Sequence, residues 1–358
     1  QKQQQQQQIQ LQQQQQQDEH DRVFYNLMLR EQRFEEAQAD LRSQCEPPAL
    51  CGQLRHSLLS WMLRVCEHQL CQDEIFPLAT IILDNFLLVN PIVTTLSHQN
   101  QHHHRHQHQL LSSQRELEQR QLLLFAACSL LLATKLRQTP RLYIQTLIEF
   151  SRLKLPIELG RGEIIDGELL MLSMLKWDLA ALVTPNEFLQ ELLARKCKRV
   201  VMNFLDHTPD DDDNDSDNNS NTDKHSAAND NGTNGEAVVY NQCNNQHQHS
   251  DTTDNNNNSN NKCNKLVDRV NRHTQTLLEL CLMDSQLSQY SSSILAMSSM
   301  AVAINGLSKT TKSACLVLED IVVQIYESTS KVNELELMID VAFQIEKYVQ
   351  TLLHAAND

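Results

Sequence analysis

Residues 122–134 form a long uncharged run, and a single lysine follows it directly. The run reads LLLFAACSLLLAT and carries no charged side chain over thirteen residues, and Lys135 follows it. Such a run is typical of a helix that other elements cover on every side. An ammonium group at the end of a buried helix has to reach the surface or find a partner. We therefore predict a central buried helix and a Lys135 that faces a partner protein.

The overall composition indicates an all-α fold. The 358 residues include only 7 glycines and 8 prolines, and 5% are aromatic, so chain breakers and β-favouring residues are scarce. A chain of this length suggests two domains. The net charge is −15, but ten Asp and one Glu against one Lys fall within residues 209–255, which leaves about −5 for the rest. Without a basic stripe, a nucleic-acid-binding protein is not expected.

The cysteines and the apolar run argue against metal sites and membrane spans. The ten cysteines are scattered at apolar positions such as Cys66, Cys128 and Cys281, which indicates reduced thiols in a core. No Cys-x-x-Cys pair occurs, so neither a zinc site nor another cofactor is expected. The apolar run is shorter than the roughly 20 residues that span a bilayer. The chain begins at Gln1 and not at Met, which leaves an upstream targeting signal open.

Three low-complexity tracts divide the chain. We expect them to be disordered, because they bury too little apolar area to offset the entropy of ordering. They are the Gln-rich residues 1–17, the His/Gln-rich residues 98–108 and the Asn/Asp-rich residues 206–262. The histidines could bind metal, but a solvated insertion is favoured. The expected organisation is a disordered start at 1–20, an N-terminal helix at 21–49, a first helical domain at 50–183 with an insertion at about 92–113, a linking helix at 184–205, a disordered insertion at 206–262 and a second helical domain at 263–358.

Local patterns place helices within these domains. Apolar residues at helical spacing form one stripe at Leu54, Leu58, Trp61 and Val65. Further helices are expected at 73–88, 141–151 and 163–175. In the linking helix Thr184 is suited to the N-cap, Pro185 to the first turn, and Glu187 to closing a capping box.

Small residues recur with the same spacing in the two halves. The matching positions are Ala126, Ser129 and Ala133 in the uncharged run and Ala296, Ser299 and Ala303 in the second half. Small residues on one helical face let a neighbouring helix approach closely. Together with similar block lengths and helix order, this predicts an internal duplication of one helical unit.

The sequence resembles the cyclins, and in particular the D-type cyclins. The resemblance covers nearly everything except the low-complexity tracts, and it lies in the segments DRV at 21–23, WMLRVCE at 61–67, CQDEIFPLA at 71–79, ILDNFL at 82–87, LLATKL at 131–136, ELLMLSMLKWDLAA at 168–181, TPNEF at 184–188 and RHTQTLLELC at 272–281. It implies two tandem five-helix cyclin boxes with a short N-terminal helix and long disordered insertions.

The resemblance also implies a function without catalysis by the chain itself. D-type cyclins bind and activate cyclin-dependent kinases of the 4/6 type by pressing on the kinase helix whose glutamate pairs with the catalytic lysine. The implied role is promotion of the G1/S transition through phosphorylation of retinoblastoma-like substrates, in the nucleus and cytoplasm. Kinase-inhibitor proteins are further implied partners; nucleic acid and membrane are not.

Two charged residues match the positions that contact the kinase in this family. They are Lys135 at the end of the third helix and Glu168 in the fifth. The alternative is that each only extends to solvent, or that the two pair with each other for stability. The kinase-binding hypothesis requires both side chains to lie close together and outside the cover of the chain's own helices.

A second family surface is a shallow apolar patch that docks Arg-x-Leu segments. Here Leu54, Leu58 and Trp61 would form this patch, unless Leu58 and Trp61 belong to the core. Ser57 replaces the usual branched apolar residue, and Arg64 replaces the acidic residue that meets the motif's arginine. Like charges repel, so weak or altered docking is expected.

Other family features are missing or altered. A Leu-x-Cys-x-Glu segment for retinoblastoma-type pocket proteins is not found, and LCQDE at 70–74 has its cysteine one place early and falls between helices. The segment is therefore either upstream of Gln1 or absent. Asn85 stands where the family commonly has arginine.

Three other functions compete with kinase activation. No nucleophile elbow, phosphate loop or HExxH motif supports an enzyme. A cyclin-fold protein of another branch, such as a transcriptional cyclin, and a helical adaptor without a kinase remain as alternatives.

Overall fold

The computed structural model describes residues 2–44, 52–90, 108–138, 142–154, 159–194, 200, 254–308, 314–329 and 334–357. Helices and short turns make up these residues, and no β-strand occurs among them. The all-α prediction is therefore confirmed.

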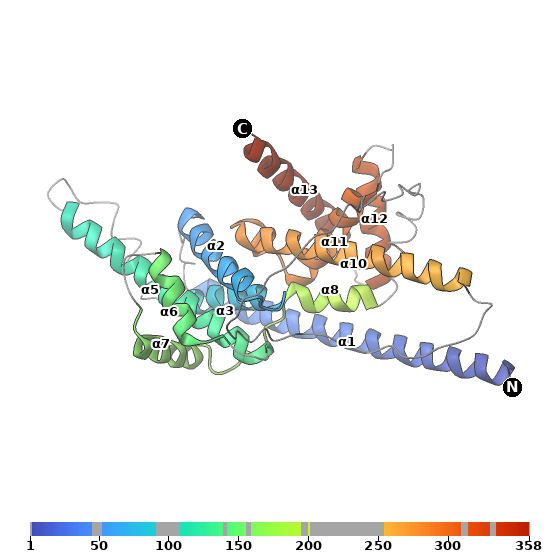
Figure 1. The fold of residues 1–358 in the computed structure, drawn as a ribbon, viewed down its shortest axis with the longest axis horizontal. Helices are drawn as coiled ribbons and strands as arrows, with labels where there is room; N and C mark the ends of the chain where they lie inside the picture. Colours follow the sequence, from blue (N-terminus) through green and yellow to red (C-terminus); the bar gives the residue numbers. More distant parts are fainter. Residues whose placement is uncertain are drawn as a thin grey trace, which may run out of the picture.

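The helices form two blocks with a long N-terminal helix and a linking helix (Figure 1). The first block contains α2 (Gly52–His68), α3 (Ile75–Val89), α5 (His108–Arg137), α6 (Ile144–Lys154) and α7 (Arg161–Met174). The second contains α10 (Asp254–Met283), the single 3-10 turn η2 (Leu287–Gln289), α11 (Ser292–Leu307), α12 (Ala314–Thr329) and α13 (Leu335–Asn357). The N-terminal helix is α1 (Lys2–Gln44), and the linking helix is α8 (Pro185–Ala194).

Each block is built around one central helix, as the uncharged runs predict. Helix α5 packs against α2, α3, α6 and α7, and α11 packs against α8, α10, α12 and α13. The small residues at matching positions are all buried: Ala126, Ser129, Ala133, Ala296, Ser299 and Ala303. Because they occupy the same kind of position in both blocks, the structure agrees with the predicted repetition of one helical unit.

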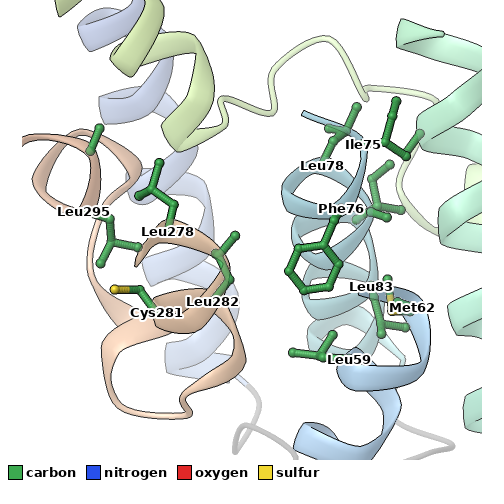
Figure 2. Packing of buried hydrophobic residues seen from close by; sticks show 14 of the residues in the cluster. Leu59, Met62, Ile75, Phe76, Leu78, Leu83, Leu278, Cys281, Leu282 and Leu295 are labelled. Atoms are coloured by element: carbon green, nitrogen blue, oxygen red, sulfur yellow. The ribbon is translucent and has the colours of Figure 1, made fainter. Parts of the chain in front are cut away.

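The two blocks meet at α2 and α3 on one side and α10 on the other. Figure 2 shows buried side chains of α10 and α11 beside those of α2 and α3. Arg55 of α2 donates to the carbonyl oxygens of Leu282 (2.8 Å) and Met283 (3.3 Å) at the end of α10, and also to Asp84 (2.8 Å). A guanidinium at a helix C-terminus satisfies carbonyl groups that lack intrahelical partners.

Helix α1 begins earlier than predicted. The expected disorder over residues 1–20, followed by a short helix at 21–49, is wrong because α1 is continuous from Lys2 to Gln44. Glutamine is a good helix former, so a helix anchored by its packed part can extend through the Gln-rich run. The anchors are Phe24, whose ring meets that of Phe188 edge-on at 5.8 Å, and Glu31, which accepts from the Ser293 backbone N–H at 2.7 Å.

The linking helix starts at Pro185 as predicted, but its capping box is incomplete. Thr184 Oγ1 accepts a long hydrogen bond from the Glu187 N–H (3.4 Å). The Glu187 carboxylate does not return to the N-cap; it binds Arg30 (3.3 Å) and Arg137. Two arginines from distant helices therefore take the carboxylate that the local pattern assigned to a cap.

The second block starts earlier in the chain than predicted. Helix α10 begins at Asp254, inside the expected insertion at 206–262, and α5 likewise begins at His108, inside the expected insertion at about 92–113. Within the described residues this block has four α-helices and the η2 turn, where five helices were expected. The remaining parts of both insertions, 92–107 and 206–253, lie outside the described residues.

The same described residues contain neither a cluster of metal-ligating side chains nor a membrane-spanning helix. There, no group of three His, Cys, Asp or Glu side chains could hold a metal ion. None of the helices in this part of the chain combines the length and apolar character that a membrane span requires. The histidines at 102–104 and 106 lie outside it.

Candidate partner-binding site

The two charged residues predicted to bind a partner lie in contact. Lys135 Nζ in the last turn of α5 forms an ion pair with Glu168 Oε1 of α7. The Lys135 side chain is 35% exposed and that of Glu168 13%. Lys135 therefore reaches the surface, whereas the chain's own helices cover most of the Glu168 side chain. The contact also matches the alternative that the two charges pair only for stability. The surroundings of the pair have to distinguish this alternative from kinase binding.

A close crossing of α5 and α7 brings these residues together. A Cβ atom added at Gly167 would lie 2.9 Å from Cys128 Sγ, so only glycine allows this approach. The Cys128 thiol donates to the Ile164 carbonyl oxygen at 3.4 Å. Burial raises the pKa of Cys128 to about 12; the Glu168 carboxylate also raises it, and Lys135 lowers it. Gly167 thus holds its neighbour Glu168 against the end of α5.

A second ion pair joins the same two helices nearer their N-termini. Arg120 donates to both carboxylate oxygens of Glu163 at 2.7 Å. Glu163 also accepts from the Gly160 N–H at 2.7 Å, and the hydrogen bond from Arg120, followed by that from Gly160, lowers the pKa of Glu163. This pair was missed from sequence, although an acidic residue in a first helical turn is a known signal for N-terminal stabilisation.

The end of α5 is fixed on its other side by arginines. Arg137 lies two residues after Lys135 and pairs with Glu187 of α8, and Arg30 of α1 pairs with the same carboxylate. Burial raises the pKa of Glu187, and the two arginines oppose that rise. Arg30 also donates to the Ala180 carbonyl oxygen (2.7 Å). Lys135 therefore projects from a segment that three other helices hold in place.

Exposed apolar side chains flank the Lys135–Glu168 ion pair. Ile165 and Leu169 of α7 are 46% and 57% exposed, and Leu136 of α5 is 49% exposed. Residues three and four apart share a helical face, so Ile165 lies beside both Glu168 and Leu169, and Leu169 directly follows Glu168 in the chain. We call Lys135, Leu136, Ile165, Glu168 and Leu169 the α5–α7 face. Sequence reasoning missed its apolar members because an apolar residue in a helix is normally assigned to the core.

The apolar docking patch is not supported by the burial of its residues. Leu58 and Trp61 are 4% and 5% exposed, and Trp61 Nε1 donates to the Phe150 carbonyl oxygen at 3.1 Å. Both therefore belong to the core, the alternative considered from the sequence, because α2 turns this face towards α6. Leu54 is half-buried and Arg64 is exposed. Weak Arg-x-Leu docking stays a prediction.

Asn85, which stands where the family commonly has arginine, forms hydrogen bonds at a buried position. Its side chain is 7% exposed, accepts from Gln38 Nε2 of α1 at 2.7 Å and donates to the Ile81 carbonyl oxygen at 2.7 Å. A neutral amide thus joins α1 to α3 at a buried position.

Comparisons with known proteins agree with this architecture. The family model described as "Cyclin, N-terminal domain" matches residues 22–180, and "Cyclin, C-terminal domain" matches residues 256–339. The chain is 30% identical over 176 residues to the G1/S-specific cyclin-D1 of Danio rerio, covering 49% of this chain and 50% of that one. It is 32% identical over 174 residues to the G1/S-specific cyclin-D3 of Homo sapiens, covering 49% of each chain.

A solved viral cyclin from herpesvirus saimiri is 18% identical, with a TM-score of 0.46, over 90% of this chain and 99% of that one. The family assignment does not depend on that likeness. The chain spans about half the length of the D-type relatives it matches. With both cyclin domains matched in order on two helical blocks, the chain belongs to the cyclin family and is similar to its D-type members.

Proposed function

We propose that this chain is the non-catalytic regulatory subunit of a cyclin-dependent kinase of the 4/6 type, which it binds and activates. The expected outcome is G1/S progression through phosphorylation of retinoblastoma-like substrates, in the nucleus and cytoplasm. The D-type relatives, whose names call them G1/S-specific, support the cell-cycle role.

The observation that carries the proposal is the α5–α7 face. It combines an ion pair whose lysine reaches the surface with the exposed apolar side chains of Leu136, Ile165 and Leu169. An ion pair that served only stability would gain little at the surface, where such pairs contribute about 0–1 kcal/mol. Apolar side chains around polar groups are instead typical of a surface that a partner covers. The Lys135 ammonium and the Glu168 carboxylate can each bind backbone groups of a kinase helix.

The decisive experiment removes both charges. The variant Lys135→Ala/Glu168→Ala should lose kinase affinity by about 2 kcal/mol or more, roughly thirtyfold in Kd, as at an interface hot spot. Affinity is measured by titrating the chain into a purified kinase of the 4/6 type, and activation by phosphorylation of a retinoblastoma fragment. Undiminished kinase binding by this variant would refute the proposed role of the pair.

The chain offers a matched control on the same two helices. The variant Arg120→Ala/Glu163→Ala also removes one cation and one carboxylate that join α5 to α7. It should bind the kinase with nearly the affinity of the parent chain, because this pair lies towards the other end of the contact. Equal losses in both variants would mean that the charges act through the stability of the α5–α7 contact.

The identity of the co-purifying kinase separates the remaining alternatives. Recovery of a transcriptional kinase would place the chain in another cyclin branch, and recovery of no kinase at all would favour a helical adaptor.

A further inference from the structure

Two cysteines meet at the C-terminus of α2. The Cys71 N–H donates to the Cys66 carbonyl oxygen at 2.9 Å, and the Leu70 N–H donates to the Glu67 carbonyl oxygen at 3.2 Å. Leu70 between them has a φ of +50°. These three features define a Schellman motif, in which the side chains at the first and sixth positions contact each other. Here both of these positions are cysteines.

The non-glycine residue in the motif is costly to hold in place. Glycine normally takes the left-handed position, because other residues lose roughly 1–2 kcal/mol there. Leu70 gains nothing from burial in return, since its side chain is 88% exposed. The turn is held by its surroundings: Gln138, just beyond α5, accepts from the Gln72 N–H at 3.1 Å. The backbone hydrogen bonds of the turn and the contact with Gln138 therefore hold the two cysteines side by side.

The two thiols have different environments. Cys66 is 7% exposed, whereas Cys71 is partly exposed, and both are free. A hydrogen bond from the Cys66 thiol lowers the pKa of Cys71, and one from the Gln138 side chain lowers it further. The pKa of Cys66 is raised by that shared hydrogen bond, then by burial, and then by the charges of Cys71, Glu279 and Glu67. A partly exposed thiol with a lowered pKa thus lies against a buried thiol with a raised pKa, and reactive and resolving thiols are paired in this way in redox-sensitive sites.

We propose that Cys66 and Cys71 are a modification site at which a hydroperoxide forms an intramolecular disulfide. The Cys71 thiolate attacks one peroxide oxygen and the O–O bond breaks. This gives a sulfenic acid at Cys71, and the departing hydroxide or alkoxide takes up a proton. The Cys66 sulfur then attacks the sulfenic sulfur, the S–O bond breaks, and water leaves with the Cys66 proton. Two thiols are oxidised to one disulfide, and hydrogen peroxide is reduced to two waters.

Two other cysteines serve as internal controls. Burial raises the pKa of Cys128 and of Cys281 to about 12, and both are fully buried. At neutral pH Cys71 should therefore alkylate at least about tenfold faster than either of them in the folded chain. Similar rates at the three positions would contradict the assigned reactivity.

The disulfide itself is tested on the full reduced chain without any kinase, so the result does not depend on the proposed function. The chain is treated with hydrogen peroxide, its remaining thiols are alkylated, and it is digested with trypsin and Glu-C. Cleavage after Arg64, Glu67 and Glu74 separates VCE from HQLCQDE. The two fragments should stay joined, with the loss of two hydrogens, until dithiothreitol is added.

Substitutions then identify each role. Cys66→Ser should stop the reaction at a Cys71 sulfenic acid that dimedone traps, while Cys71→Ser should leave Cys66 unmodified. Gln138→Ala should slow alkylation of Cys71 severalfold by removing a donor to its sulfur, and circular dichroism checks that each variant is folded. Peroxide treatment that links Cys71 to another cysteine, or oxidises it without a Cys66 link, would overturn the proposal.

Discussion

The central helices of the two blocks, α5 and α11, perform the same packing task but end differently. Both bury an Ala–Ser–Ala face, and each is packed against several other helices. Helix α11 contains no ionisable side chain and ends at Leu307. Helix α5 ends in Lys135 and Arg137, which pair with residues of α7 and α8. The shared part of the pattern builds a core, and the charged end that α5 alone carries marks the surface for which we propose a partner.

The largest expected effect comes from filling the small-residue faces. Ala133→Leu in α5 and Ala303→Leu in α11 should each destabilise the chain by about 1–3 kcal/mol, because neither helix crossing has room for the added atoms. Urea unfolding measures both variants, with Ala194→Leu at an exposed position as the control. A strong effect in one helix and none in the other would break the equivalence of α5 and α11.

Glycine substitutions sharpen the same comparison. Gly167→Ala should destabilise the chain by about 1 kcal/mol, because its Cβ would lie 2.9 Å from Cys128 Sγ and overpacking outweighs the better helix propensity. It should also weaken kinase binding by displacing Glu168.

Two matched glycines supply the controls. At Gly162 in α7 and Gly306 in α11 an added Cβ meets nothing within 4 Å. Alanine there should be neutral or stabilise the chain by up to about 1 kcal/mol in thermal unfolding. Cys128→Ala should relieve the Gly167→Ala variant, since it removes the sulfur that the new Cβ would meet. Failure of that rescue would locate the tight contact elsewhere.

The junction between the blocks should respond to pH through Glu279 of α10. Burial raises its pKa from 4.5 to about 7, and Asp73 and Glu67 of the first block add to the rise. The folded state therefore binds the proton more tightly, so stability from this group is present below pH 4.5 and is lost as the pH rises to about 7. Because Glu279 is partly exposed, Glu279→Gln should stabilise the chain by only about 1 kcal/mol at pH 8.

The control for this prediction is the same unfolding measurement at low pH. At pH 4 the glutamate is protonated in both states, and the gain from Glu279→Gln in denaturant unfolding should vanish. A gain of the same size at both pH values would show that ionisation of Glu279 is not its cause.

The smallest expected effect concerns the cap of α8. Thr184→Ala should cost about 0.5 kcal/mol, the low end for an N-cap, because the hydrogen bond to the Glu187 N–H is long at 3.4 Å. Glu187→Ala should cost more in the same thermal unfolding assay, since it removes the acceptor that joins arginines of α1 and α5 to α8. The reverse order would indicate that the local cap dominates.

Residue patterns were sufficient for much of the fold and for two members of the site. The stripe on α2, the uncharged run of α5 and the start of α8 at Pro185 all lie where local periodicity and capping chemistry placed them. Lys135 was noticed because a charge that ends an uncharged run is conspicuous, and the resemblance to D-type cyclins implied the role of both Lys135 and Glu168. Leu136, Ile165 and Leu169 were not, because a sequence does not show which apolar residues a neighbouring helix leaves uncovered.

The sequence by itself determined that this chain is helical, that it has two blocks each with a central buried helix, and that one of these helices ends in a charge. These properties follow from the spacing of apolar and small residues along single segments. Only the tertiary structure decided that Lys135 meets Glu168, that Trp61 faces inward and that Glu187 binds Arg30 and Arg137. Those contacts join residues far apart in the chain, so they depend on how closely helices cross, which at Gly167 is set by the space of a single methyl group.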